Sequence, residues 1–418
     1  MDYNARPMKI LLSSIGSRGD VQPLVALALE LQALGEDARL CVPPNFKSWV
    51  ESFGLTCFPI GPDLKQWMAQ PAPSPPVKPS AEQLLALASH TVRTQFPVIA
   101  EAARGCDLVV GATALQFATR SIAESLGIPY VFAAYCPAVF PSPDHPPPKI
   151  PEHHPAGLPA SENLALWAAE DERWNDLFRV AINEGRAGLG LDSIEDVRSH
   201  LFTDAPWLAA DPMLGPAGAT LRGMQIRQTG AWLYSNSTAL PAVLERFLDD
   251  GKPPVYLGFG SMRAADSTGP MLVEAARALG LRSIVSRGWG NLAAIDGASD
   301  CLAIDDVSHE KLFRRVAAVV HHGGAGTTAR AARAGVAQVI VPHNYDQYYW
   351  GHRVHQLGIG ASSVDREHLT VDALAEALSQ ALHPDVTTRA LTLADRIRPD
   401  GARLAAKALS NLSRQPGD

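Results

Sequence analysis

The residues best suited to chemistry lie in one short stretch, 321–327, where two histidines precede a glycine-rich turn. The apolar run 316–320 before it predicts a buried strand, and the alanine-rich run 327–334 after it predicts a helix. Glycine lets a backbone come close to a ligand, and the start of a helix offers unpaired N–H groups and a positive dipole end. The stretch therefore predicts an anion site, with His321 or His322 as an added hydrogen-bond donor.

The pattern of this glycine turn narrows the kind of anion site. It lacks the Gly-Lys-Ser/Thr of a Walker loop, and its glycines do not follow the G-x-G-x-x-G spacing of a dinucleotide fold. We interpret it as a phosphate cradle of another kind; the alternative is an ordinary strand–helix connection. The residues predicted to form the cradle are His321, His322, Gly323, Gly324, Ala325, Gly326 and Thr327.

A second polar group follows the next predicted strand, 338–342. Asp346 and Gln347 come shortly after that strand. Consecutive strands of a parallel sheet end at one crevice, so these two side chains are expected beside the phosphate cradle. A carboxylate accepts hydrogen bonds, and an amide both accepts and donates them, so the pair suits vicinal hydroxyl groups. A phosphate cradle next to a hydroxyl clamp predicts a nucleotide-sugar site.

Together, the cradle, Pro342 and the Asp346–Gln347 pair resemble the donor signature of GT-B glycosyltransferases. The likeness is greatest to the UDP-glycosyltransferase-like bacterial natural-product branch, with its glycopeptide and sterol glycosyltransferases. It covers nearly the whole chain and is strongest over 255–360. The resemblance implies an α/β fold of two Rossmann-like domains, each with a doubly wound parallel sheet, on either side of an interdomain cleft.

The length of 418 residues also predicts more than one domain. A strand–helix–strand start indicates a parallel first sheet, and a stretch rich in glycine and proline, 211–218, marks a hinge. We expect an acceptor-binding domain over 1–214, a linker over 215–235 and a donor-binding domain over 236–398. The resemblance implies that the last segment, 399–418, is a helix that returns to the first domain.

The first predicted strand, 8–14, leads into a glycine-containing turn that ends at Asp20. The turn presents Asp20 at the carboxyl end of the strand; the alternative is that Asp20 only caps the following helix, expected over 23–31. The resemblance implies that Asp20 is the general base. Wider relatives have a histidine with an aspartate partner here, and no partner for Asp20 is evident after the predicted strand 108–111.

Further donor contacts are expected at the ends of other strands. Ser261, at the end of the strand 255–261, offers a hydroxyl and an N–H to a phosphate. Trp289, after the strand 283–286, either lines a pocket for the nucleotide base or belongs to the core. The resemblance implies that backbone groups of Val307 hold the base. Ser17, Arg18 and Arg287 complete the expected set of donor-binding residues.

Two proline-rich loops, 71–79 and 137–155, and the helix around Trp167 and Trp174 are interpreted as the wall of an acceptor site; the alternative is a pair of solvated insertions. The resemblance implies inverting transfer from UDP-glucose or a TDP-sugar to a hydroxyl of a lipophilic or aromatic natural product, such as an antibiotic, polyketide or sterol-like aglycone. Two other functions stay open: a non-catalytic sugar-nucleotide-binding partner, and a sugar-nucleotide epimerase of the same fold.

Composition argues against several other classes. The net charge is −7 and no basic stripe occurs, which argues against nucleic acid. No run of 18 apolar residues predicts a membrane span, although peripheral membrane contact stays open. Five scattered cysteines favour reduced thiols and a cytoplasmic chain. His352 and His355 lack a third ligand, so we expect no metal and no cofactor, the nucleotide-sugar being a substrate.

Overall fold

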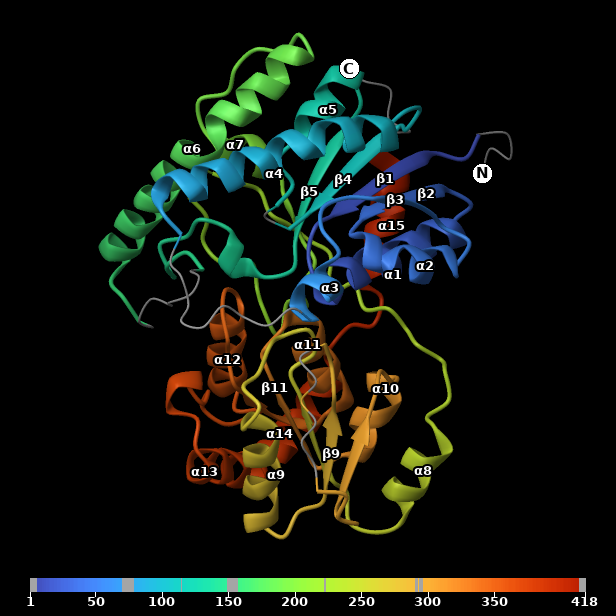
Figure 1. Ribbon diagram of the computed structural model, residues 1–418, viewed down its shortest axis with the longest axis vertical. Coiled ribbons are helices and arrows are strands. Elements are labelled where there is room, and N and C mark those ends of the chain that lie inside the picture. Colours follow the sequence, from blue (N-terminus) through green and yellow to red (C-terminus); the bar gives the residue numbers. More distant parts are fainter. Residues whose placement is uncertain are drawn as a thin grey trace.

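The computed structural model describes residues 6–69, 79–113, 115–148, 157–221, 223–289, 292 and 296–412. Two lobes are stacked along the long axis of the molecule, the N-lobe above the C-lobe in Figure 1. Each lobe contains one parallel sheet with helices on both faces, which confirms the predicted pair of doubly wound domains.

The N-lobe sheet has seven strands in the order β3-β2-β1-β4-β5-β6-β7, all parallel. Its central strands are apolar and buried on both faces, as a parallel sheet covered by helices requires. The strands are β1 (Lys9–Ser14), β2 (Asp37–Val42), β3 (Thr56–Pro59), β4 (Leu108–Ala112), β5 (Tyr130–Ala134), β6 (Trp207–Leu208) and β7 (Arg227–Gln228).

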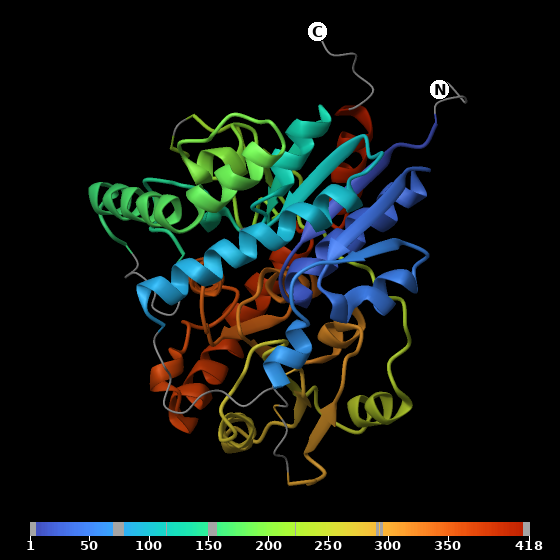
Figure 2. The same ribbon diagram turned by 45° about the horizontal axis from the view of Figure 1, so that its top comes forward.

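The helices of the N-lobe come from both ends of the chain. The terminal helix α15 places Ala405 and Leu409 in the same hydrophobic core as Leu24 of α1 and Leu12 of β1. Figure 2 shows this red helix among the blue elements of the upper lobe. The N-lobe helices are α1 (Arg18–Ala33), α2 (Lys47–Glu51), α3 (Leu64–Ala69), α4 (Ala81–Ala102), α5 (Thr119–Leu126), α6 (Ala160–Gly188), α7 (Val197–Phe202) and α15 (Gly401–Leu412).

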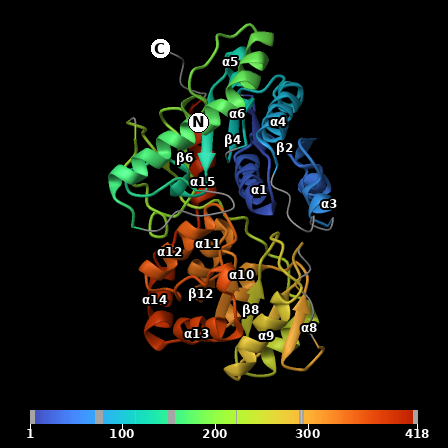
Figure 3. The same ribbon diagram turned by 60° about the vertical axis from the view of Figure 1, so that its left-hand side comes forward.

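The C-lobe sheet has five parallel strands in the order β10-β9-β8-β11-β12. They are β8 (Val255–Gly258), β9 (Ser283–Ser286), β10 (Cys301–Ile304), β11 (Ala318–His321) and β12 (Ala337–Ile340). The helices around this sheet are α8 (Ala242–Asp249), α9 (Thr268–Ala278), α10 (His309–Leu312), α11 (Ala325–Ala334), α12 (Gln347–Gln356), α13 (Val371–Ala381) and α14 (Pro384–Ala394), as Figure 3 shows from the side.

The two sheets share one topology. In each, the chain starts in a central strand, adds strands on one side, and then crosses back to the other side. The reversal falls between β1 and β4 in the N-lobe and between β8 and β11 in the C-lobe. Ligands of open parallel sheets bind outside the carboxyl ends of strands at such a reversal. The residues after β1, β8 and β11 therefore occupy the positions expected for a site.

Three strands were not predicted from the sequence: β3, β7 and β10. The edge strand β7 lies inside the stretch 215–235, predicted as a linker, and adds to the N-lobe sheet beside β6. It has only two residues, Arg227 and Gln228, both polar. A strand of two residues is too short to show a hydrophobic pattern. Its position is set by backbone pairing with β6 and not by burial of its side chains.

Candidate active site

Asp20 lies in the first turn of α1. Its Oδ2 atom accepts hydrogen bonds from the backbone N–H of Ser17 at 2.6 Å and from the Ser17 hydroxyl at 3.1 Å. The two residues form a capping box, so α1 begins at Arg18, five residues before the predicted start. Asp20 is therefore in the helix rather than in the preceding turn. Both hydrogen bonds use one carboxylate oxygen, which leaves Oδ1 uncommitted to Ser17.

The surroundings of Asp20 fix its position and raise its pKa. A Cβ atom on Gly16 would lie 2.2 Å from Asp20 Oδ2, so only glycine leaves room for the carboxylate there. The Tyr135 hydroxyl donates to the backbone oxygen of Asp20 at 3.0 Å. Burial raises the pKa of Asp20 to about 6, and the Ser17 hydrogen bonds counteract part of this rise. Burial thus makes Asp20 a stronger base than a helix N-terminus alone would allow.

The glycine turn, residues 322–324, joins β11 to α11 in the C-lobe. Gly323 has a φ of +88°, which an L side chain rarely adopts, and Gly324 is the N-cap of α11. The helix begins at Ala325, two residues before the predicted start, and ends at Gly335 as expected. Ala325 and Gly326 thus lie in its first turn, where backbone N–H groups lack intrahelical partners, whereas the Thr327 N–H donates to the Gly324 oxygen at 3.1 Å. This arrangement can bind an anion.

The two histidines of the glycine turn have different environments. His321 is fully buried; its Nδ1 accepts the Gly323 N–H at 3.1 Å, so its Nε2–H donates to the Gln338 side-chain oxygen at 2.9 Å. With both ring nitrogens used inside the lobe, His321 shapes the turn and has no N–H left to donate to a ligand. His322 is half-buried, and its Nδ1 has no hydrogen-bond partner among the described residues. Of the two predicted donors, His322 is the better placed.

Ser261 lies in a tight turn after β8, the strand that pairs with β11. The His322 ring lies between this turn and the glycine turn, since a Cβ on Gly260 would be 3.3 Å from Cε1 and one on Gly324 would be 2.5 Å from Nε2. The N–H of Trp289 donates to the Gly260 oxygen at 2.9 Å. Ser261 and His322 therefore border the same strand ends.

Asp346 and Gln347 lie beside the glycine turn. A Cβ on Gly323 would be only 3.0 Å from the Gln347 backbone oxygen, so the two loops are in direct contact. The Gln347 side-chain oxygen accepts the N–H groups of His343 at 2.7 Å and Asn344 at 3.2 Å, and Gln347 is 6% exposed. These bonds of the amide oxygen hold the loop together; the contact of Gln347 with a sugar hydroxyl stays a prediction. Asp346 uses one oxygen, Oδ2, to accept the Trp350 indole N–H at 3.2 Å.

The lobes bring Asp20 and Asp346 to one gap. Burial, and then the negative charge of Asp20, raise the pKa of Asp346 to about 7. Tyr135, which donates to the Asp20 backbone oxygen, and Trp350, which donates to the Asp346 side chain, both line the pocket between the lobes. Gly19 of α1 and Gly326 of α11 line the same pocket, and Figures 1 and 3 both show α1 above α11. The predicted base and the predicted cradle therefore face each other.

Four other predicted donor residues lie at the ends of β9 and β10 or opposite them. Arg18 of α1 forms an ion pair with Asp306 across the lobes, and Arg287 pairs with Asp305 at 3.1 Å. The centroid of the Trp289 ring lies 5.8 Å from that of Phe46, so Trp289 bridges the lobes and packs against the N-lobe core; its contact with a nucleotide base stays a prediction. Val307 is half-buried against the hydrophobic cluster beneath α10.

The predicted acceptor wall is only partly described. Residues 70–78 and 149–156 of the two proline-rich loops lie outside the described residues. Trp167 and Trp174 of α6 are buried against the Arg198 guanidinium. The Trp167 indole N–H donates to the His145 oxygen at 2.9 Å. Both rings are buried in the N-lobe, so they do not form an exposed wall. Trp167 supports the second loop through its hydrogen bond to His145.

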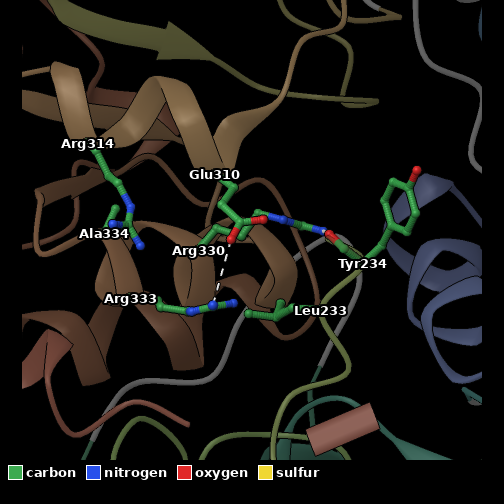
Figure 4. Close-up of a pocket in the computed structure, with 7 residues that line it drawn as sticks. All are labelled: Leu233, Tyr234, Glu310, Arg314, Arg330, Arg333 and Ala334. Carbon is green, nitrogen blue, oxygen red and sulfur yellow. Dashed lines mark hydrogen bonds and ion pairs between the residues drawn. The ribbon is translucent and has the colours of Figure 1, made fainter. Parts of the chain in front are cut away.

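A second pocket lies on another face of α11, where the linker meets the C-lobe (Figure 4). Arg330 donates to the Tyr234 backbone oxygen at 3.4 Å, and Arg333 lies 3.7 Å from Glu310. Burial and the nearby charge of Arg18 lower the pKa of Arg330 to about 10. Tyr234 packs edge-on against Trp49 of the N-lobe. The contacts of Tyr234 with Arg330 and Trp49 therefore fix the linker against both lobes. The lining residues of this pocket are Leu233, Tyr234, Glu310, Arg314, Arg330, Arg333 and Ala334.

Sequence reasoning missed three residues that shape the site: Tyr135, Trp350 and Arg263. Tyr135 directly follows the apolar run 130–134, and Trp350 follows Asp346 by one helical turn. The sequence shows these positions but not the contacts that the two side chains make. Arg263, two residues after Ser261, donates to the backbone oxygen of Met68 in α3 at 2.6 Å and 2.9 Å. No pattern indicates that contact, because it joins residues 195 positions apart.

Fold and site together define a class of protein. GT-B glycosyltransferases consist of two doubly wound lobes that face each other across a cleft, and this chain has that architecture. It resembles the crystal structure of the glycosyltransferase VinC in complex with DTDP with a TM-score of 0.68, over 98% of this chain and 100% of that one, at 20% identity. None of the helices in the described part of the chain has the length and apolar character needed to cross a bilayer.

Sequence comparisons identify the family. Residues 10–140 match the glycosyltransferase family 28 N-terminal domain, and residues 298–403 match the erythromycin biosynthesis protein CIII-like C-terminal domain. Glycosyltransferase GtfE of Amycolatopsis orientalis is 43% identical over 96% of this chain and 97% of its own length. Vancomycin aglycone glucosyltransferase of the same organism is 42% identical over 96% and 97%. The chain therefore belongs to the glycosyltransferase family of these relatives and is a glycosyltransferase.

Proposed function

We propose that the enzyme transfers a sugar from UDP-glucose or a TDP-sugar to a hydroxyl group of a lipophilic or aromatic natural product, with inversion and with Asp20 as the general base. The observation that carries the proposal is the placement of Asp20 and the glycine turn on opposite lobes around one gap. A base from one lobe and a diphosphate site from the other are the two groups that this reaction needs.

In the proposed mechanism, the acceptor hydroxyl lies near Asp20 Oδ1. Asp20 removes the hydroxyl proton as the oxygen attacks the anomeric carbon, and the bond from that carbon to the diphosphate breaks on the opposite side. Attack opposite the leaving group inverts the anomeric configuration, and no covalent intermediate is needed. General base catalysis of this kind contributes about 10²–10⁴-fold to the rate.

The leaving diphosphate gains negative charge as the bond breaks. The first turn of α11 supplies N–H groups and a positive dipole end, and His322 supplies a side-chain donor. Preorganised donors of this type contribute about 2.7–4 kcal/mol each to transition-state stabilisation. Burial and the neighbouring histidines lower the pKa of His322 to about 3, so its ring is neutral at pH 7 and donates one N–H. With these donors the proposal requires no metal and no cofactor.

The relatives support the substrate classes. One relative is named a vancomycin aglycone glucosyltransferase, and a protein of the same fold has a crystal structure with DTDP. Asp346 Oδ1 is the proposed acceptor of a donor-sugar hydroxyl. All five cysteines are free and buried, which supports a reducing, cytoplasmic compartment.

The experiment that tests the proposal is Asp20→Asn. Asparagine still accepts the Ser17 N–H, so the helix start is preserved. We expect kcat to fall about 10²–10⁴-fold, while calorimetry shows unchanged affinity for UDP or dTDP. Asp196→Asn at the N-cap of α7 is the matched control, since it changes a capping aspartate far from the gap. Full activity of Asp20→Asn would remove Asp20 from the role of base.

Two further measurements test the alternative functions, the epimerase and the non-catalytic partner. Incubation of the wild-type enzyme with a nucleotide-sugar and no acceptor, followed by mass spectrometry and NMR, reveals an epimerase if the sugar isomerises. Nucleotide-sugar binding without any product across a panel of aglycones would favour a non-catalytic partner.

A further inference from the structure

The indole of Trp350 touches both the predicted sugar clamp and the hinge. Trp350 is 2% exposed and lies on α12, one helical turn after Asp346. Its Nε1–H donates to Asp346 Oδ2 at 3.2 Å. A carboxylate has two oxygens, so this bond ties one of them and leaves Oδ1 for a ligand.

The other end of the indole packs against the segment where the N-lobe sheet leads into the linker. A Cβ on Gly215 would lie 2.8 Å from Cη2 of Trp350 and 3.2 Å from Cδ of Pro137. One turn further along α12, Arg353 donates to the Leu214 backbone oxygen at 2.9 Å. The start of α12 therefore presents Asp346 to the gap, while its next turn is fastened to the N-lobe.

We propose that Trp350 is a positioning residue, which fixes the Asp346 carboxylate for the donor sugar and ties its orientation to the contact between α12 and residues 213–215. This inference rests on the proposed function, in which Asp346 accepts a hydrogen bond from a sugar hydroxyl. Trp350 itself contacts no substrate in this proposal.

The physical argument concerns a buried carboxylate with a like charge nearby. Asp346 lies in a desolvated position next to Asp20, and the Trp350 hydrogen bond counteracts the resulting rise of its pKa. Without the indole N–H, the side chain loses both a favourable partner and the contact that sets its rotamer. In the proposed function Asp346 contacts the sugar and not the nucleoside diphosphate, so its orientation affects the binding of the nucleotide-sugar alone.

Trp350→Phe tests this, since it keeps an aromatic ring and removes the N–H together with part of the ring that packs against Gly215. Calorimetry with UDP-glucose and with UDP, and with the dTDP pair in parallel, gives two affinities for each variant. We expect the Kd for the nucleotide-sugar to rise about tenfold, the effect of one hydrogen bond to a charged group. The Kd for UDP alone stays unchanged. A residue with a purely structural role would affect both ligands equally.

Trp232→Phe is the matched control. Trp232 is also 2% exposed and lines the same pocket, on the side of Tyr135 and Asp20, and its indole N–H donates to Thr229 at 2.9 Å and not to Asp346, so it controls for the loss of an indole at this pocket. We expect its two Kd values to equal those of the wild type. Should Trp350→Phe give little folded protein, Gly215→Ala tests the same link, because the added methyl group pushes against the Trp350 ring. It is expected to lower the preference for the sugar-bearing ligand.

Asp346→Asn separates this inference from the proposed function. If Asp346→Asn loses the preference for UDP-glucose over UDP and Trp350→Phe retains it, the positioning role is wrong and the proposed contact stands. If Asp346→Asn retains the preference, the proposed contact of Asp346 with the sugar is wrong. Equal weakening of UDP and UDP-glucose by Trp350→Phe would also overturn the inference.

Discussion

At the scale of single residues, two aspartates determine what the gap can do. Each has one carboxylate oxygen held by its own lobe: Asp20 by Ser17, and Asp346 by Trp350. Both have a raised pKa, mainly because they are buried, and Asp346 also because it lies near Asp20. A base with a pKa close to the working pH combines the correct protonation state with a useful proton affinity. Burial, not sequence, gives Asp20 this property.

The raised pKa predicts the pH dependence of the reaction. Asp20 must be ionised to accept a proton, so activity is lost as the pH falls through its pKa of about 6. We expect kcat/KM for the acceptor to level off above about pH 7 and to fall about tenfold per pH unit well below 6. Asp346 has the higher pKa, about 7, and is largely protonated while Asp20 titrates, so Asp346→Asn should leave the midpoint near 6. A flat profile between pH 5 and 8, in an enzyme that stays folded, contradicts this assignment.

At the scale of elements, the site depends on two helices that start at the gap. Helix α1 follows β1 and helix α11 follows β11. Each of these strands borders the point where the order of strands in its sheet reverses. Two glycines at the start of α11 have different functions. Gly323 needs its positive φ and its contact with the Gln347 loop, whereas Gly326 has ordinary helical geometry and only the flexible Arg330 side chain nearby. Alanine substitutions at these two glycines can therefore distinguish a role in the fold of the turn from a role in ligand binding.

Gly323→Ala and Gly326→Ala are expected to differ. Alanine at position 323 costs about 1–2 kcal/mol in the left-handed region and pushes the two loops apart, so both the melting temperature and UDP affinity should fall. Alanine at position 326 should leave the melting temperature unchanged or higher, because alanine favours helix. Its methyl group obstructs the diphosphate, so UDP affinity should fall about tenfold, as when one charge-assisted hydrogen bond is lost. Unchanged UDP binding by Gly326→Ala would place the diphosphate elsewhere.

At the scale of the whole molecule, contacts across the lobes set the width of the gap. The Arg18–Asp306 ion pair is partly exposed, so it contributes little to stability. Arg263 donates to backbone oxygens of Met68 and Trp67 at the end of α3, which lie in the other lobe. Trp289 and Phe46 add an aromatic contact beside them. Arg263 carries the most hydrogen bonds of these three contacts.

Arg263→Ala should therefore open the ligand-free enzyme. Loss of about 1.4 kcal/mol of interlobe contact changes the ratio of closed to open forms about tenfold, which small-angle X-ray scattering detects as a larger radius of gyration. Arg282→Ala is the matched control, because Arg282 donates to the Phe247 and Lys252 backbone oxygens within the C-lobe alone. A radius of gyration that stays the same in both variants shows that Arg263 does not hold the lobes together.

The sequence by itself determined the type of fold and the order of its parts. Apolar runs such as 108–110 and 283–286 predict buried strands, and Gly335 predicts the end of α11, because burial and backbone geometry act within a few residues. The same locality made Asp20, the glycine turn and Asp346 recognisable, since each directly follows a strand. Whether those residues act as proposed is a matter for the substitutions above.

Only the tertiary structure decided which side chains remain free for a ligand. His321 and His322 look equivalent in sequence, yet the His321 ring is hydrogen-bonded to Gln338 on the neighbouring strand. Gln347 is used by its own loop, and Trp289 is shared with the opposite lobe. The proximity of Asp20 to Asp346, which raises the pKa of the latter, also exists only when the lobes are stacked. Hydrogen bonds and charges depend on distances between segments far apart in the chain, and no local pattern contains those distances.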